Sequence, residues 1–478
     1  MSNIRKHLIL AVIAVSVISN YSSATSLSIE NEYDLTGISY PNLDFDTSTS
    51  TDSIAFYTQR LRVSISGKFS PELEVFTKFQ MLGVVGSSNP WQQFNWQKNY
   101  PYPNMNFQPF IENAYMKAYG FEDLPIELTI GKQPLEYGAG LIISDNDAGI
   151  NALKLVVNYP FELRTEIFTA KLKENFFQSS DLDLQGVVAI YPLNDKKLEI
   201  GFFEERDFTG TPYVQGLTSK LTNKINKIYY DLRYSKQGKT GHYFVELAYQ
   251  KGTIDLQDGT NMILDGKAFS AQVFMTNEKS RIGKVTAFGN FSASSGDQNP
   301  TGTSAGNIDE SFNPSFSRRY NGLKKKGWGE YFSSSFSDCL WDVPRDAATG
   351  IPNYSGLGVI GYGLDFSPWF GWTFGIAQYG YSASESINTN APKLSGGSIS
   401  IGGSGASIES LGGILVSGDL TKKIYNLGGE LNLTMSYTYS KYLLFKFGFL
   451  RYTPPVFAEI WPRSETTEAF TFETNFKF

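Results

Sequence analysis

Hydrophobic and polar side chains alternate along most of the chain with a period of two residues. This period puts successive side chains on opposite faces of a β-strand, so each such segment predicts a strand with one apolar face. The expected strands are residues 27–35, 55–65, 73–81, 111–119, 126–133, 152–159, 162–172, 183–191, 198–205, 228–234, 242–250, 268–276, 284–293, 356–366, 370–379, 425–437, 442–450 and 469–478. The pattern therefore predicts an all-β protein of about 18 strands.

The last of these segments ends the chain on an aromatic residue. One parity holds Phe470, Phe472, Phe476 and Phe478, and the other holds Thr471, Glu473, Asn475 and Lys477. Soluble proteins tend to end in polar, frayed residues, whereas the closing strand of a membrane barrel needs lipid-facing rings to its end. The segment also resembles the terminal signal by which bacterial outer-membrane barrels are recognised for insertion.

Short and long connections alternate between the expected strands. Turns such as 67–71 and 120–125 are brief, whereas 86–108 and 294–354 are long. This alternation predicts a transmembrane up-and-down antiparallel β-barrel with short periplasmic turns, long extracellular loops and both chain ends on the periplasmic side. Residues 328–336 also look strand-like, but a further strand would break the alternation, so we assign them to an external loop.

The start of the chain predicts export. Arg5, Lys6 and His7 precede an apolar run over residues 8–18, and Ser22-Ser23-Ala24 supplies small residues for cleavage. Residues 1–24 are therefore expected to be a signal peptide, and residues 25–478 a single outer-membrane barrel domain. The aromatic content of 15%, with 28 Tyr and 36 Phe, suits the lipid-facing band and aromatic girdles of a barrel in the bacterial outer membrane.

The composition argues against other classes of function. A net charge of −6 disfavours a nucleic-acid binder, and the single Cys339 can form no internal disulfide. The two histidines are His7, in the signal peptide, and His242, so no catalytic triad or metal-site spacing is visible. We therefore expect no enzyme activity and no cofactor.

A channel acts through the side chains that face its lumen. Six basic residues have the inward parity on the early strands: Arg60, Arg62, Lys78, Lys117, Lys154 and Arg164. They could form a basic path for an anionic solute, or pair with nearby carboxylates in a neutral network that stiffens the wall. The carboxylates nearby are Glu30, Glu32, Asp34, Glu74, Glu162 and Glu166. The parity of Lys132 instead points toward lipid unless Gly131 forms a bulge.

Two further groups allow more than one interpretation. Trp91, Trp96, Tyr100, Tyr102 and Phe107 lie in or beside a long loop, where they could stack on sugar rings or serve as ordinary loop packing. Asp145, Asn146 and Asp147 resemble calcium ligands in type, but three residues do not make a site, so we prefer a solvated turn.

Several short stretches carry a family resemblance. They are Arg60-Leu61-Arg62-Val63, Gly131-Lys132-Gln133 followed by Tyr137-Gly138, Ser294-Ser295-Gly296-Asp297, Glu310-Ser311-Phe312-Asn313-Pro314 and Gly327-Trp328-Gly329-Glu330. Together they resemble motifs of the alginate-export family of bacterial outer-membrane β-barrels, with Lys132 where that family usually has Arg. The resemblance implies an 18-stranded channel, in the bilayer of the outer membrane, that would work with periplasmic export partners.

These observations favour an outer-membrane channel, of porin or exporter type, for an anionic or sugar-like solute. The alternative of a different class is a structural or adhesive barrel with a plugged lumen.

Overall fold

The described part of the chain is built from strands whose side chains alternate between two environments. The computed structural model describes residues 26–40, 54–84, 106–120, 124–145, 147–174, 181–210, 213–215, 218–220, 222–296, 308–315, 355–385, 426–453 and 466–478. Within these ranges, no helix is both long and apolar enough to cross a membrane.

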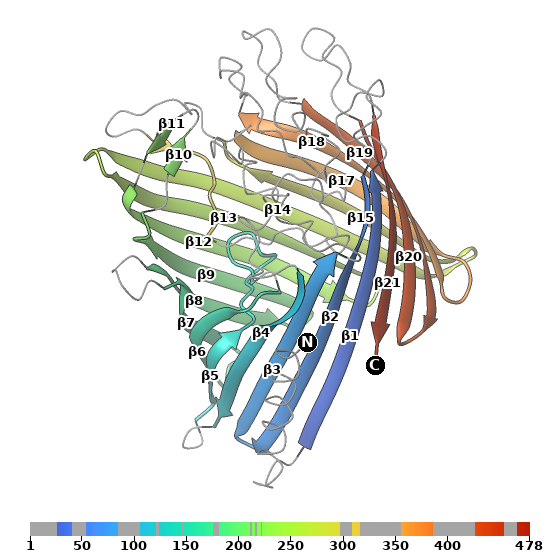
Figure 1. The fold of residues 1–478 in the computed structure, drawn as a ribbon, viewed down its shortest axis with the longest axis horizontal. Coiled ribbons are helices and arrows are strands. Elements are labelled where there is room, and N and C mark those ends of the chain that lie inside the picture. Colours follow the sequence, from blue (N-terminus) through green and yellow to red (C-terminus); the bar gives the residue numbers. More distant parts are fainter. Residues whose placement is uncertain are drawn as a thin grey trace.

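Eighteen antiparallel strands form a closed barrel (Figure 1). They are β1 (Ser26–Tyr40), β2 (Ile54–Ser70), β3 (Leu73–Val84), β4 (Asn106–Tyr119), β5 (Ile126–Gln133), β6 (Ile150–Asn158), β7 (Arg164–Lys173), β8 (Leu182–Leu193), β9 (Lys196–Asp207), β12 (Thr222–Gly238), β13 (Gly241–Leu256), β14 (Asn261–Ser280), β15 (Gly283–Ser294), β17 (Ser355–Ser367), β18 (Trp372–Glu385), β19 (Asn426–Ser440), β20 (Leu443–Thr453) and β21 (Thr467–Lys477). Every expected segment overlaps one of these strands, so the predicted barrel and strand number are confirmed.

The barrel closes where its first and last strands meet. β1 pairs with β21 from Glu32 opposite Lys477 to Ser39 opposite Phe470. The main chains of Asn31 and Phe478 extend this pairing by two reciprocal hydrogen bonds, of 2.9 and 3.0 Å. The closing strand predicted from the last ten residues is therefore paired on both sides, with β20 and with β1.

Three short strands are not among the eighteen strands of the barrel wall. β10 (Tyr213–Gln215) and β11 (Thr218–Lys220) pair with each other, and β16 (Ile308–Asp309) runs parallel to β14. β16 belongs to the connection between β15 and β17. The residues after it lie against the inner wall, because the Tyr229 hydroxyl donates a hydrogen bond of 2.7 Å to the carbonyl of Asn313.

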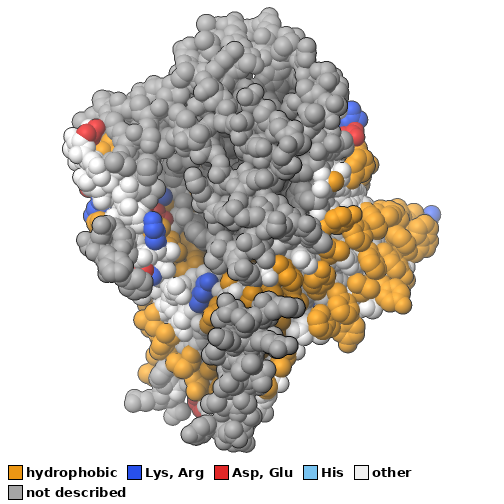
Figure 2. All heavy atoms as spheres, viewed as in Figure 1, with side chains coloured by type: hydrophobic (Ala, Val, Ile, Leu, Met, Phe, Trp, Pro, Cys, Tyr) orange, Lys and Arg blue, Asp and Glu red, His pale blue; other side chains and the backbone are white. Residues whose placement is uncertain are grey.

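The two faces of the wall differ as the alternation predicts. Outward side chains such as Ile200, Leu247 and Ile360 are apolar and exposed, whereas inward neighbours such as Glu199, Glu246 and Tyr379 are buried. Figure 2 shows hydrophobic side chains gathered over the outer surface on the right of the view, where β19 to β21 lie. An exposed apolar band around a closed barrel is the surface that a lipid bilayer covers.

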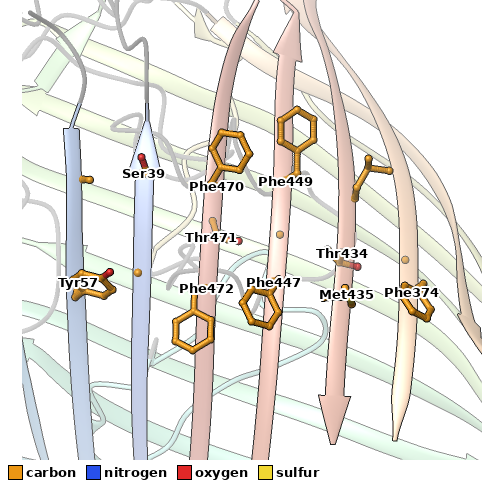
Figure 3. Close-up of a pocket in the computed structure, with 15 residues that line it drawn as sticks. Ser39, Tyr57, Phe374, Thr434, Met435, Phe447, Phe449, Phe470, Thr471 and Phe472 are labelled. Carbon is orange, nitrogen blue, oxygen red and sulfur yellow. The ribbon is translucent and has the colours of Figure 1, made fainter. Parts of the chain in front are cut away.

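The outer surface carries a shallow recess that crosses the closing seam. It has a volume of about 810 Å³ and extends from β18 across β21 to β2 (Figure 3). Outward rings such as Phe470, Phe447 and Tyr57 line it. Because these rings belong to the lipid-facing parity, the recess is not part of the interior path.

The connections fall into two classes, one at each end of the barrel. Residues 71–72, 194–195, 239–240 and 441–442 are tight turns at the end where β21 finishes. The opposite end holds the longer connections, with one exception. β13 and β14 are joined by residues 257–260 alone. Both strands are long, because their apolar–polar alternation continues up to this turn. The side chains of Ile254, Leu256, Met262 and Leu264 pack together there on the inner side.

Several expectations fall outside the described residues. These are the signal peptide at 1–24, the strand-like segment 328–336, Cys339, and the aromatic residues from Trp91 to Tyr102. Phe107 belongs to β4 rather than to a loop.

We predict that deleting Phe478 will reduce barrel assembly several-fold. The deletion removes both hydrogen bonds to Asn31 and the last ring of the lipid-facing row, at the seam that closes the sheet. The fraction of protein that runs as the compact, unboiled band on a gel measures assembly. The variant Phe478→Leu keeps the main-chain bonds and apolar bulk, so it should assemble better than the deletion; equal and undiminished assembly of both would contradict the prediction.

Candidate functional site

The connection between β5 and β6 folds into the barrel interior. We call residues 134–149 the inner loop; residue 146 lies outside the described part of the chain. Its apolar residues Leu141, Ile142 and Ile143 are at most 2% exposed. A bridge between Glu136 and Ser144, and a hydrogen bond of 3.2 Å from Tyr137 N–H to the carbonyl of Ile143, fold it back on itself.

Two charged residues on the far wall hold the tip of the inner loop. Arg233, on β12, donates to the carbonyl of Gly138 at 2.9 Å, and the Glu246 carboxylate, on β13, accepts the N–H of Ala139. Gly138 has a φ of 63°, and a Cβ there would lie 2.5 Å from a Glu246 oxygen. Only glycine therefore allows the tip to approach this closely.

Aromatic contacts support the same end of the loop. The Tyr137 ring stacks on Phe168 with 5.4 Å between centroids, and its hydroxyl donates a hydrogen bond of 3.1 Å to Glu166. Phe203 lies 5.5 Å from the same ring. Burial and the neighbouring charge of Glu166 raise the pKa of the Tyr137 phenol far above its usual range, so the phenol stays protonated.

The other end of the inner loop is held by the opposite wall. Asp147 forms ion pairs with Arg60 at 3.2 Å and with Arg62 at 2.7 Å, and Gln80 donates to its carbonyl at 3.2 Å. Burial opposes ionisation of Asp147, but the two guanidinium groups outweigh it and hold the pKa of this carboxyl well below its usual range. The inner loop thus spans the lumen from β2 to β12 and β13.

The first group of predicted site residues surrounds this anchor. Arg60 also pairs with Asp34 at 3.2 Å, and Arg62 pairs with Glu32 at 3.3 Å and Glu112 at 3.1 Å. Lys78 pairs with Glu112 at 2.9 Å. The three cations therefore share four carboxylates, and these charges come close to balancing.

The second group lies further around the wall. Lys117 pairs with Glu127 at 2.8 Å, and Arg164 and Lys154 lie 2.7 and 3.9 Å from Glu166. All six predicted site residues thus lie in two paired groups rather than in one uncompensated row.

Glu32, Asp34 and Glu166 pair with these bases, as expected for a neutral network. Three other expectations about individual residues are wrong. Glu74 and Glu162 do not compensate the arginines: Glu74 accepts from Ser66 and Tyr119, both at 3.2 Å, and Glu162 is an exposed turn residue. Asp145 and Asp147 do not form a solvated turn, because the first is buried and the second is ion-paired.

Lys132 keeps the outward parity, since it pairs with Ala114 across β4 and donates to the carbonyl of Ile111 at 2.8 Å. Gly131, next to it, has a φ of 122°, and a Cβ there would lie 2.4 Å from the carbonyl oxygen of Ala114. The glycine is therefore needed for close pairing of β4 and β5, and it does not turn Lys132 into the lumen.

Sequence reasoning missed three residues of this site, Glu112, Arg233 and Glu246, and noted Tyr137 only as part of a motif. Their contacts join distant parts of the chain, and no local pattern marks such contacts. The available signal was the run from Gly138 to Ile143, where glycines precede consecutive apolar residues in a connection that should otherwise be polar. Within the described residues, no three His, Cys, Asp or Glu side chains are grouped as a metal site.

No family model and no curated protein matches this sequence. Solved structures resemble it along nearly the whole chain. OpdO of Pseudomonas aeruginosa matches at 9% identity and a TM-score of 0.51, over 96% of this chain and 99% of that one. OccK9 (OpdG) of the same organism matches at 9% and 0.52, over 95% and 99%. OccAB2 of Acinetobacter baumannii matches at 10% and 0.50, over 96% and 99%.

At these sequence identities the structural likeness establishes the fold alone. The apolar exterior of the barrel indicates that a membrane surrounds it. The protein is a bacterial outer-membrane β-barrel. The short turns of this outer-membrane barrel, at the end that holds Phe478, face the periplasm, and the longer connections face the outside. The inner loop enters the lumen from the outer side.

We predict that docking of the inner loop weakens as pH rises from about 4 to about 7. Burial, followed by the charges of Asp147, Glu136 and Glu112, raises the pKa of Asp145 to about 7, although the N–H of Gly149 opposes this shift. The folded state therefore holds a proton that the unfolded chain releases, and stability falls across this window. The loss should be a few kcal/mol at most.

Heat-induced unfolding of the barrel in detergent, followed from pH 4.5 to 7.5, checks this expectation. The variant Asp145→Asn cannot ionise, so its unfolding temperature should exceed that of the native protein increasingly toward pH 7.5. Asp183→Asn is the control, at a half-exposed position on β8 where the carboxylate pairs with Lys171 at 3.0 Å. Parallel pH profiles for the native protein and Asp145→Asn would show that Asp145 does not titrate in this range.

Proposed function

We propose that this barrel is an outer-membrane channel that passes an anionic or sugar-like solute through a charged lumen. The observation that carries the proposal is the inner loop, which crosses the interior and is fixed at both ends by charged side chains. A loop held in this way narrows a wide barrel to a passage of defined chemistry, which a purely structural barrel does not require.

The six basic residues divide by exposure into two roles. The side chains of Arg60 and Arg62 are 8% and 11% exposed and are surrounded by carboxylates, so we assign them to holding the inner loop. Those of Lys117 and Arg164 are 29% and 42% exposed, and each has one carboxylate partner. These two, with Lys78 and Lys154, are the members of the proposed solute path that a passing anion can reach.

An acidic polysaccharide, delivered by periplasmic partners, is the solute of this class that the resemblance to alginate-export barrels would imply. Two residues of the motif have structural roles instead. Lys132 faces outward, and Gly138 forms the tip of the inner loop. The support for a polysaccharide therefore rests on the exposed bases of the lumen rather than on this motif.

One observation favours the alternative of a plugged barrel. The inward side chains of Glu430, Leu450 and Ala469 are at most 1% exposed, which marks a part of the wall that is not open to a passing solute. A passage must therefore run along the other walls, where the exposed cations lie. In the plugged alternative, no conducting passage exists. We retain the prediction that the protein is not an enzyme.

Two double variants test the assignment, because each removes two positive charges from the lumen. Lys117→Gln with Arg164→Gln should shift the reversal potential in a salt gradient toward cations and leave assembly unchanged. Arg60→Gln with Arg62→Gln leaves Asp147 and Glu112 without their guanidinium partners, so it should lower the yield of folded barrel.

The measurements are reversal potentials in planar bilayers and the fraction of compact, unboiled protein. If the first double variant leaves ion preference unchanged, the exposed bases do not select the solute. If the second assembles normally and changes ion preference, the arginines select rather than hold the loop.

A further inference from the structure

A row of aromatic rings lies on the inner wall opposite the charged early strands. We call His242, Phe274, Phe288 and Tyr379 the aromatic wall. Successive ring centroids are 4.3, 5.8 and 6.4 Å apart. The first three are cross-strand partners on β13, β14 and β15, so they form a row across the strands, beginning near the periplasmic turns.

The rings face the lumen and not the membrane. Their odd-numbered neighbours on β14 and β15, Val273 and Phe291, are exposed on the lipid side. Strand alternation places Phe274 and Phe288 on the opposite face. Both rings are half-buried, so part of each ring is open to the interior.

Glycines on β17 make room for the row. A Cβ on Gly363 would lie 2.5 Å from the Phe288 ring, and one on Gly361 would lie 2.5 Å from the Tyr379 ring. β17 therefore contributes no side chain at these positions, and the rings of its two neighbouring strands extend over it. The result is a row of rings across five strands, partly exposed on β13, β14 and β15 and buried at Tyr379 on β18.

An amide with no partner lies at the base of this surface, with both of its amide atoms buried. Asn290 is on β15, two residues from Phe288 and on the same face, and is 6% exposed. Neither its amide oxygen nor its amide nitrogen has a hydrogen-bond partner in the structure. A buried amide left in this state costs free energy, so a ligand that supplies both a donor and an acceptor would be favoured there.

The surroundings of the aromatic wall combine neutral and charged groups, since Asp365 is the cross-strand partner of Thr286 and Glu430 that of Tyr379. Gln272 lies directly across from Asn290, and the hydroxyls of Thr276 and Thr286 pair at 3.1 Å. Arg233, which holds the tip of the inner loop, lies with its guanidinium carbon 4.8 Å from the ring centre of the adjacent Phe244. The aromatic wall thus starts beside the constriction and offers flat apolar surface next to hydrogen-bonding amides and hydroxyls.

We propose that the aromatic wall is a binding site for the pyranose rings of an oligosaccharide. Such a ring has an apolar C–H face that can pack on the exposed phenyl faces, while its hydroxyls donate to and accept from the amides of Asn290 and Gln272. This inference rests on the proposed channel function and deepens it. It assigns sugar recognition to β13–β18, separately from the basic residues of the early strands.

The test uses the purified full-length protein in planar bilayers, with maltohexaose as a neutral oligosaccharide probe. Each sugar that binds in the lumen should interrupt the current for its residence time. Phe274→Leu and Phe288→Leu keep apolar bulk but remove the flat face, so each should shorten residence about three- to tenfold. The control is Phe291→Leu, the same change on the lipid-facing side of β15, and it should leave residence unchanged.

The remaining outcomes each decide the matter. An open channel without sugar-induced interruptions, or equal residence in all variants, overturns the aromatic wall while the channel stands. A native protein that never conducts overturns the proposed channel and this inference with it. If a leucine variant fails to assemble, Asn290→Leu provides the second measurement, and residence equal to that of the native protein overturns the role of the amide.

Discussion

The rest of the structure depends on closure of the sheet between β1 and β21. Main-chain groups of a strand in hydrocarbon have no water to bind, so every edge must be paired. Here the last residue of the chain completes that pairing through its two hydrogen bonds with Asn31. Closure also separates two environments, since each strand then presents one parity to lipid and the other to an enclosed interior. The strands can therefore carry charged side chains across the membrane, because those side chains point into the enclosed interior rather than into lipid.

Charge pairing within that interior determines the shape of the passage. The inner loop occupies part of this interior, with its apolar residues buried and its two ends bound to opposite walls. At one end a carboxylate on the loop meets two arginines on β2. At the other, main-chain groups of the loop meet Arg233 and Glu246. Some of the basic side chains that the sequence suggests as a solute path therefore hold the inner loop instead. The exposed fraction of each side chain distinguishes those that hold the loop from those that line the proposed path.

The strands could be predicted from the sequence because their signal is local. Alternation within a segment such as Ile126–Gln133 depends only on which face meets lipid, and β5 has those bounds in the structure. The site could be predicted only in part. Arg60 and Arg62 were identifiable from parity, but their partner Asp147 lies 87 residues from Arg60, and nothing local links them. The aromatic wall was missed for the same reason, because Phe274, Phe288 and Tyr379 become neighbours only when four strands pair.

The central claim is that the inner loop narrows a conducting passage. Single-channel conductance tests it most directly, by comparing the native protein with a variant in which residues 139–144 are replaced by two glycines. The account predicts steady openings for the native protein and larger steps for the variant, since shortening the loop widens the passage while the strands stay paired. Silence from both proteins, or steps of equal size, would contradict it.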